Sequence, residues 1–400
     1  MKNRYTGEGE PRSLFDAIER HLKNRKKHNA IGETCGIGFV FYTYERLIND
    51  AMGAAILMSE LAEPSDPITV GASAYDTAVM ILAASVLSRS IIISDPGESL
   101  TFNGIVITNK NTYSPRFISP SELRTLIAGV LSRGTPALPT CERGNAEISF
   151  RAGGQSDTYS ERAALLSAAA FNAGCAIAKN DRLISLFTPS SPEGLFCGIL
   201  APLIAGSSSA VCADARSTVR YMRSLSPTKL FCPTEVAGAI LLKILRIKKK
   251  FPRTSYSHSP LDTTRLWINR LSHPRISYLL GGRLRALIVA GEIPEGSANA
   301  LFSFGIYSIM MRSVRGLSPA LFRYAGDRIG KWSLPLGADA DMRNVQKGGV
   351  GNLVLSSEGV RMGESVGHTY AENEKLSKTS LITPLKCFIM KNGGVFLVKK

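Results

Sequence analysis

The sequence predicts an α/β protein built on doubly wound parallel sheets. Its 400 residues are 44% apolar and 20% charged, a composition that supports a large core and argues against general disorder. Short apolar runs alternate with helix-length segments, as in sheets covered by helices on both faces. In the clearest case, 279–319, apolar runs at 286–290 and 306–311 flank a helical segment at 295–304. This stretch predicts one βαβ unit of a buried sheet.

The same stretch predicts where a ligand would bind. In open parallel sheets, ligands lie beyond the carboxyl ends of the strands. Gly291 follows the first apolar run, and residues 312–319 follow the second. We therefore expect both at the rim of a site.

The other elements follow from the same periodicities. A basic amphipathic helix is expected within 13–30, followed by a short strand and a helix within 39–61. The remaining predicted elements are strands at 68–70, 91–93 and 146–150, helices at 74–88, 160–174 and 235–247, and loops at 109–120, 133–144 and 251–276.

Charge and cysteine usage restrict the classes of function. The net charge of +16 attracts polyphosphates, anionic lipid surfaces or nucleic acid, although a solvated basic surface gives the same figure. The seven cysteines include no C-x-x-C pair, and the five histidines no H-E-x-x-H motif. Neither a disulfide framework nor a metal site is predicted.

We expect neither a secretory signal nor a membrane span. The N-terminus, MKNRYTGEGEPRS, has no apolar run of the signal type. The most apolar run, 78–87, is about half of the ~20 residues that a spanning helix needs. The prediction is a cytoplasmic protein, at most peripheral to the inner face of the membrane.

Two motifs carry a family resemblance. Gly305, Ile306, Ser318 and Pro319 keep the spacing of the motif Gly-Ile-Pro-Val-x-x-Gly-Tyr-Gly-x-Thr-Glu-x-Ser-Pro. The run 42–47, Tyr-Thr-Tyr-Glu-Arg-Leu, is similar to an opening motif Tyr-Thr-Tyr-x-Glu-Leu. Both motifs, and the order of segments over roughly 35–400, resemble the AMP-forming acyl-CoA and acyl-carrier-protein synthetases, a family that also holds luciferase and peptide-synthetase adenylation domains.

The resemblance implies a more detailed fold than the periodicities do. It implies two doubly wound α/β/α subdomains within an AMP-binding-like region at 1–337, divided at approximately 1–145 and 146–337. A partial, small β-barrel subdomain is expected at 338–400. The chain then stops where the family places the hinge to its mobile C-terminal domain, so that domain is expected to be lacking.

The resemblance also implies a set of residues around a nucleotide. The segment 151–160 occupies the place of the family's loop Thr-Ser-Gly-Thr-Thr-Gly-x-Pro-Lys-Gly, whose backbone N–H groups and Lys hold ATP phosphates. The predicted nucleotide or phosphate site comprises Arg151, Gly153, Gly154, Ser156, Tyr159, Gly291, Ser313, Arg315, Gly316 and Thr383. The predicted acyl pocket comprises Gly194, Thr234 and Gly291, with Ser190 and Ser191 where the family usually has a His or an aromatic residue.

The polar residues that adenylation needs are replaced in this sequence. Tyr159 stands at the loop Lys, which neutralises the triphosphate, and Gly316 at the Glu, which holds Mg²⁺. Leu385 stands at the Asp that accepts the ribose hydroxyls, and the second catalytic Lys belongs to the missing domain. We therefore predict no catalytic and no metal-binding residues. ATP and Mg²⁺ are implied by the resemblance alone.

Three hypotheses of function follow. The first is a degenerate synthetase-like protein without full adenylation activity, which binds an acyl chain, a nucleotide or a protein partner. The second is an active ligase that makes acyl-AMP and then a thioester with CoA or acyl carrier protein, either through substituted residues or with a C-terminal domain in trans. The third is a basic protein that binds anionic lipid or nucleic acid.

A basic cluster bears on the third hypothesis. Lys243, Lys248, Lys249 and Lys250 end an apolar helix and predict contact with an anionic membrane surface, although cations at a helix C-terminus also complement its dipole. Nucleic acid is the less favoured partner, because the sequence shows no aromatic motif for stacking on bases.

Overall fold

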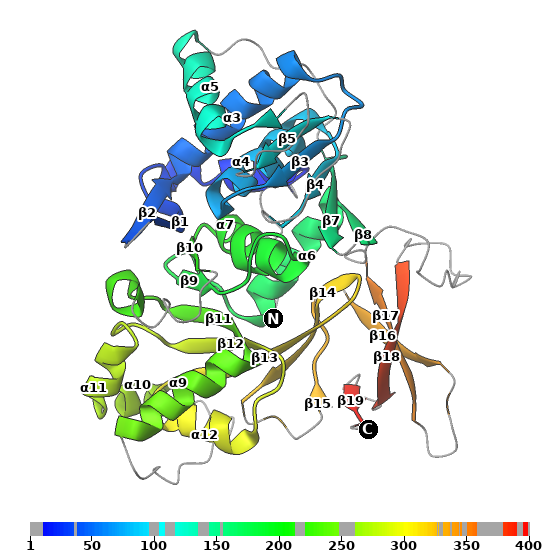
Figure 1. Ribbon diagram of the computed structural model, residues 1–400. Coiled ribbons are helices and arrows are strands. Elements are labelled where there is room, and N and C mark those ends of the chain that lie inside the picture. Colours follow the sequence, from blue (N-terminus) through cyan, green and yellow to red (C-terminus); the bar gives the residue numbers. More distant parts are fainter. Residues whose placement is uncertain are drawn as a thin grey trace.

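The computed structural model describes residues 11–35, 38–95, 104–108, 117–134, 144–152, 155–212, 221–247, 261–325, 327, 331–336, 338–343, 345, 350–357, 379–389 and 395–398. The chain forms three sheets, with helices packed between and around them (Figure 1). The predicted α/β class is confirmed.

The largest sheet has eight strands in the order β14-β13-β12-β11-β9-β10-β1-β2. The six central strands are parallel, and β2 and β14 are added antiparallel at the edges. The strands are β1 (Asn29–Cys35), β2 (Gly38–Thr43), β9 (Arg182–Ser185), β10 (Ser208–Val211), β11 (Lys229–Pro233), β12 (Ala286–Ala290), β13 (Tyr307–Val314) and β14 (Leu317–Tyr324). The predicted βαβ unit is confirmed, because β12 and β13 pair in parallel.

A second sheet has six strands in the order β6-β5-β3-β4-β7-β8. Its strands are β3 (Ile68–Gly71), β4 (Ile91–Ile93), β5 (Ile105–Thr108), β6 (Phe117–Ile118), β7 (Glu147–Ala152) and β8 (Gln155–Ser160). The β7–β8 pair is antiparallel, and the other pairs are parallel. The predicted subdomain limit near residue 145 lies just before β7, inside the segment that builds this sheet.

The third sheet is antiparallel, with five strands in the order β15-β19-β18-β17-β16. The strands are β15 (Lys331–Trp332), β16 (Asp339–Arg343), β17 (Gly351–Ser357), β18 (Thr379–Ile389) and β19 (Val395–Leu397). This sheet corresponds to the small β subdomain expected from residue 338 onward, and its first strand already begins at Lys331.

Helices cover the faces of the two parallel sheets. They are α1 (Leu14–Glu19), α2 (Leu22–Arg25), α3 (Tyr44–Leu61), α4 (Ala74–Leu87), α5 (Pro120–Ser132), α6 (Glu161–Gly174), the π-helical η1 (Glu193–Leu200), α7 (Ala201–Ile204), α9 (Thr234–Ile247), α10 (Leu261–Leu271), α11 (Pro274–Leu279) and α12 (Glu295–Ser303). Five of them begin after a Ser or Thr whose side-chain oxygen accepts an N–H of the first turn, at Ser13, Thr43, Ser73, Ser119 and Ser160.

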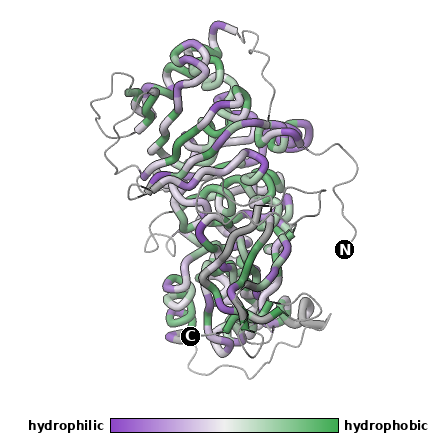
Figure 2. Tube along the Cα trace, turned by 90° about the vertical axis from the view of Figure 1, so that its right-hand side faces the viewer, coloured by the Kyte–Doolittle hydropathy of each residue, from purple (hydrophilic) through white to green (hydrophobic). Residues whose placement is uncertain are grey.

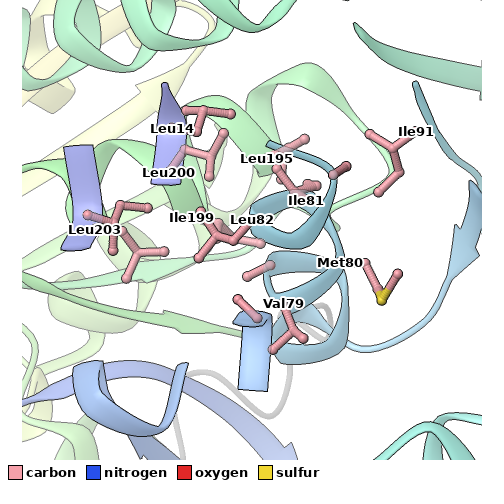
Figure 3. Close-up of a cluster of buried hydrophobic side chains, with 14 of the residues drawn as sticks. Leu14, Val79, Met80, Ile81, Leu82, Ile91, Leu195, Ile199, Leu200 and Leu203 are labelled. Atoms are coloured by element: carbon pink, nitrogen blue, oxygen red, sulfur yellow. The ribbon is translucent and has the colours of Figure 1, made fainter. Parts of the chain in front are cut away.

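The α4 helix lies at the centre of one large apolar core. All 14 of its residues are buried, including the polar Asp76, Thr77 and Ser85. Figure 3 shows Leu82 and its neighbours on α4 facing Leu195, Ile199 and Leu200 of η1, with Leu14 of α1 beside them. The core therefore continues from the six-stranded sheet into the helices of the eight-stranded sheet.

Apolar and polar stretches alternate along the trace in both sheet layers (Figure 2). Over the described ranges, no helix combines the length and the apolar character needed to cross a bilayer. The fully buried α4, which contains the most apolar run of the sequence, has 14 residues.

Several predicted bounds are confirmed, and two predicted loops are wrong in their described parts. The loop predicted at 109–120 contains β6 and the first residue of α5. The structure has β4 and β12 at the predicted residues, and α9 starts one residue earlier than predicted. The predicted loop at 251–276 is wrong in its described part, where α10 and α11 lie. Its arginines and polar residues obscured the helical spacing of Trp267, Ile268 and Leu271.

Candidate functional site

Strands of the eight-stranded sheet end together at one edge, which we call the rim. β9 ends at Ser185, β11 at Pro233 and β12 at Ala290, all in parallel, so the segments that follow them meet there. β13 continues past this edge into a hairpin with β14. The rim thus comprises 188–193, 234, 291–292 and 312–316.

The segment 151–160 does not form the expected long loop. The pairing of β7 with β8 extends as far as Ala152 and Gln155, so two residues separate the paired strands. Gly153 and Gly154 lie outside the described residues. The predicted loop is therefore corrected to a β-hairpin, and a Gly-Gly pair between two strands is a hairpin signal in its own right.

The hairpin buries Tyr159, the residue at the position of the family's Lys. Tyr159 is 1% exposed and pairs with Ile148. Its ring packs edge-on against Phe150 and Phe196, with centroids at 5.8 and 5.1 Å. Burial, and then the charge of Glu193, raise the pKa of Tyr159, so the side chain is neutral in the physiological range. Ser156, on the same strand, is exposed.

Arg315 connects the rim to the six-stranded sheet. Its Nη2 lies 3.3 Å from Oδ1 of Asp157 on β8, and its Nε lies 3.4 Å from both carboxylate oxygens. Arg315 and Gly316 form the two-residue turn of the β13–β14 hairpin, since Val314 pairs with Leu317. Gly316 has φ of +90°, which favours glycine at this position. The Arg315 side chain is 54% exposed, so its pair with Asp157 contributes little to stability.

A second ion pair lies next to Gly291. Nη2 of Arg312 is 3.7 Å from Oε1 of Glu292, and its guanidinium lies 5.6 Å from the ring centroid of Trp332. The neighbouring Ser313 Oγ is 2.9 Å from Ser318 Oγ. Each arginine of the rim therefore faces a carboxylate of the same chain.

The predicted acyl-pocket residues are only partly brought together. Gly291 has φ of +133°, and a Cβ built there would lie 2.2 Å from Thr234 Oγ1, so these two residues are in contact. Gly194 is instead the second residue of η1, where a Cβ would lie 1.7 Å from the carbonyl oxygen of Thr188. Glycine is required at both positions by close approach of neighbouring atoms.

Two further predicted residues lie in structural roles. Thr383 Oγ1 donates to the carbonyl of Leu353 at 2.9 Å and accepts the N–H of Leu385 at 3.2 Å. Leu385 itself packs against a second cluster of buried apolar residues, which includes Leu353, Leu355 and Cys387. Lys243 is exposed on α9, whereas Lys248, Lys249 and Lys250 lie outside the described residues. Arg151 is half-buried on β7.

Sequence reasoning missed the carboxylates at the rim and beside it. Asp95 accepts a 2.5 Å hydrogen bond from Ser190 Oγ and so links the ends of β4 and β9. Asp95 and Glu292 each follow a buried strand by two residues, which is a signal for a rim position. Asp157 and Glu193 gave no such signal.

The rim residues do not fit a Mg²⁺–triphosphate complex. Such a complex needs oxygen ligands for the metal, and N–H groups and cations for the phosphates. Asp157 and Glu292 face arginines, Gly316 has no side chain, and Tyr159 is neutral and buried. In the described part of the chain, no three His, Cys, Asp or Glu residues are grouped to hold a metal ion.

Comparison with solved structures identifies the fold. The structure of VinN superposes with a TM-score of 0.74 at 14% identity, covering 99% of this chain and 100% of VinN. The N-terminal domain of FACL13 from Mycobacterium tuberculosis gives 0.70 at 12% identity, covering 97% of this chain and 100% of that domain. The anthranilate CoA ligase AuaEII, in complex with anthranoyl-AMP, gives 0.66 at 14% identity, covering 96% and 76%.

These neighbours are adenylate-forming proteins, so the chain has the fold of their N-terminal AMP-binding domain, as its motifs predicted. At these identities the likeness concerns the fold alone. No protein-family model matches the sequence, and no curated protein matches it.

Proposed function

We propose that this chain uses the adenylate-forming fold as a binding scaffold, does not itself form acyl adenylates, and binds a small carboxylate at the rim through Arg315. The observation that carries the proposal is the hairpin at β7–β8. Two residues between Ala152 and Gln155 replace a loop whose backbone N–H groups would surround a triphosphate.

The charges at the rim support the same proposal. Losing one preorganised donor costs about 10²–10³ in rate, and here the loop, its Lys and the Mg²⁺ carboxylate are all replaced. Tyr159 supplies neither charge nor an exposed side chain. Arg312 and Arg315 remain, and a single carboxylate needs no more than one such bidentate partner.

Arg315 can bind a ligand carboxylate in place of Asp157. Its pair with Asp157 is long and half exposed, so a ligand carboxylate exchanges with it at small cost. A further structure of VinN is a complex with L-aspartate, and the AuaEII structure holds the adenylate of an aromatic acid. Such ligands support a carboxylate as the chemical class for this chain.

Two measurements on the purified chain test the proposal. ATP–pyrophosphate exchange with Mg²⁺ is expected to stay at the level of a protein-free blank for L-aspartate, anthranilate and decanoate. Exchange above that level with any of the three contradicts the non-adenylating part of the proposal.

Calorimetric titration with the same three acids tests the binding part. At least one is expected to bind, and Arg315→Ala is expected to weaken it roughly 10- to 100-fold, the usual loss for a charged hydrogen bond. Arg133→Ala, at an exposed arginine of the α5 C-cap, is the matched control and should bind like the parent chain. Equal affinity in the Arg315→Ala chain, or binding of none of the acids, contradicts a carboxylate site at Arg315.

An active ligase is the second candidate. It is favoured by the whole-chain likeness to VinN, with 99% coverage, and by the adenylate bound in AuaEII. On this hypothesis ATP and Mg²⁺ bind at the rim, and a separate C-terminal domain supplies the missing Lys and passes the acyl group to CoA or an acyl carrier protein. It predicts a rise in melting temperature with Mg²⁺–ATP, since a ligand at 100 times its Kd adds about 2.7 kcal/mol. An unchanged melting temperature excludes it.

The basic character of the chain supports a third candidate, a cytoplasmic protein that touches an anionic surface. The net charge of +16 and the exposed Lys243 motivate it. Binding to anionic surfaces that weakens steeply with salt is its expected result. Retention that does not depend on salt contradicts it.

A further inference from the structure

The α10 helix turns its apolar side outward. Trp267, Ile268 and Leu271 are 64, 51 and 60% exposed, and they share one face because they lie one and four positions apart. The inward face carries Leu266, Asn269 and Arg270, which are partly buried. A helix of a globular protein normally shows the opposite arrangement.

Contacts on the inward face hold α10 in this orientation. Asn269 Nδ2 donates to the carbonyl of Phe302 at 3.2 Å, and Arg270 Nη2 donates to the carbonyl of Gly282. Gly305 lies so close that a Cβ there would be 2.6 Å from both Leu266 O and Arg270 Cβ. Rotating the helix to bury Trp267 would break both hydrogen bonds and this close approach.

The chain after the first turn of α10 is basic, whereas that first turn contains Asp262. Between 264 and 285 the sequence has five arginines and no Asp or Glu. Arg275, Arg283 and Arg285 are exposed, in α11 and the turn that follows it. Tyr278 is 66% exposed, and the Arg223 guanidinium lies 4.8 Å from its ring centroid. We use the name α10 face for the exposed Trp267, Ile268 and Leu271 of α10 together with the exposed residues of the next segments, Arg275 and Tyr278 of α11 and Arg283 of the turn after it.

We propose that the α10 face docks on an anionic lipid surface, with the arginines at the headgroup phosphates and the apolar side chains at the acyl boundary. An apolar stripe containing Trp, flanked by arginines, is the composition of helices that lie in membrane interfaces. The charge is complementary to an anionic leaflet. The surface lies on α10 and α11, not on the lysines that end α9, and the proposal does not depend on the chemistry of the rim.

The same charges argue against a second copy of the chain, and the apolar side chains argue against a nucleic acid, as the partner of the α10 face. In a symmetric dimer through this face, the arginines of one copy would lie against those of its partner, which is destabilising. A nucleic acid would contact the arginines but would leave Ile268 and Leu271 without an apolar partner.

The chain carries its own reporter for the test. Of its two tryptophans, Trp267 is exposed and Trp332 is 0% exposed. The full chain is mixed with vesicles of phosphatidylcholine alone, or of equal phosphatidylcholine and phosphatidylglycerol. Co-sedimentation and a blue shift of tryptophan emission are expected with the anionic vesicles only, and both should weaken as salt rises. Trp267→Phe should keep the binding and lose the shift.

Paired variants separate docking from general charge. Arg275→Ala with Arg283→Ala is expected to weaken vesicle binding about 25-fold, at a factor of roughly five per arginine near an anionic surface. Lys23→Ala with Lys27→Ala removes the same charge from the exposed residues around α2 and should change binding far less. Leu271→Ser should weaken it, whereas Leu126→Ser, at a side chain 37% exposed on α5, should not.

Three results overturn the proposal. The first is an equal loss of vesicle binding in the double arginine variant and the double lysine variant, which would indicate binding through non-specific charge. The second is an unchanged Trp267 emission on vesicles that do bind the chain. The third is a concentration-dependent dimer, or an RNA complex, that Leu271→Ser abolishes while vesicle binding persists.

Discussion

Replacing Asp181 by Ala should destabilise the chain more than most single substitutions, because it leaves Lys229 buried without its counter-charge. The two side chains are 8 and 9% exposed, and Nζ lies 3.0 Å from Oδ2. Removing one partner of a buried pair costs about 3–5 kcal/mol. At roughly 2.1 cal/mol/K of unfolding entropy per residue, 4 kcal/mol corresponds to about 5 °C in the melting temperature of these 400 residues.

The assay is thermal unfolding followed by circular dichroism, with two controls. Lys229→Met with Asp181→Leu removes both charges and should melt within about 2 °C of the parent chain, since apolar replacements of buried pairs are often near neutral. Lys229→Met alone leaves Asp181 with its hydrogen bonds from Thr228 Oγ1 at 2.7 Å and Ala178 N at 2.9 Å. An Asp181→Ala chain that melts within about 1 °C of the parent refutes the buried-charge argument.

The same pair predicts a pH dependence. Burial alone would raise the pKa of Asp181, but the hydrogen bonds from Thr228 and Ala178 and the charge of Lys229 outweigh it, and the pKa falls below its ordinary 3.8. The folded state therefore favours the ionised form of Asp181 more than the unfolded chain does. This contribution is present above about pH 5 and is lost as the pH falls through the lowered pKa. Asp181→Ala should flatten the acid limb of the stability profile, and an unchanged limb contradicts this.

Three further substitutions test the site and the core by the same melting assay. Gly291→Ala should cost at least ~1–3 kcal/mol, because of its positive φ and the 2.2 Å approach to Thr234 Oγ1, and Thr234→Ala should recover part of that loss. Tyr159→Phe should change the free energy of unfolding by no more than about 1 kcal/mol, whereas Tyr159→Lys should lower it by several kcal/mol. The Tyr159→Lys chain should also show no ATP–pyrophosphate exchange. Measurable exchange would mean that the missing charge, and not the hairpin, limits the chemistry. Leu82→Ala in the core of Figure 3 should cost about 2–5 kcal/mol, and a loss below 1 kcal/mol would mean that α4 is not tightly packed.

The sequence predicted the parallel core well because its signals are local. The run 286–290 is continuously apolar, ends at a glycine and has the length of a strand, and β12 occupies those residues. The helix α4 was equally clear from its alanines, which predicted a helix at 74–88. In both cases burial on every side leaves one interpretation of the pattern.

The site was predicted less well because its contacts join distant segments. No local signal places Asp157 beside Arg315, since their meeting depends on two hairpins from different sheets. The β7–β8 hairpin was missed because its Gly-Gly pair was aligned with a longer loop in related proteins. The α10 helix was missed because its apolar side chains face outward, whereas the apolar side of a surface helix normally faces the core.

The burial of α4 limits how the molecule moves. Its apolar residues belong to a core that both sheet layers share, so sliding one layer over the other would expose the side of the helix that packs against α1, β1 and η1. The two layers are therefore expected to move as a single block, without a hinge between them at α4. Any rearrangement that accompanies ligand binding must then occur at the periphery, in the hairpins and in the antiparallel sheet.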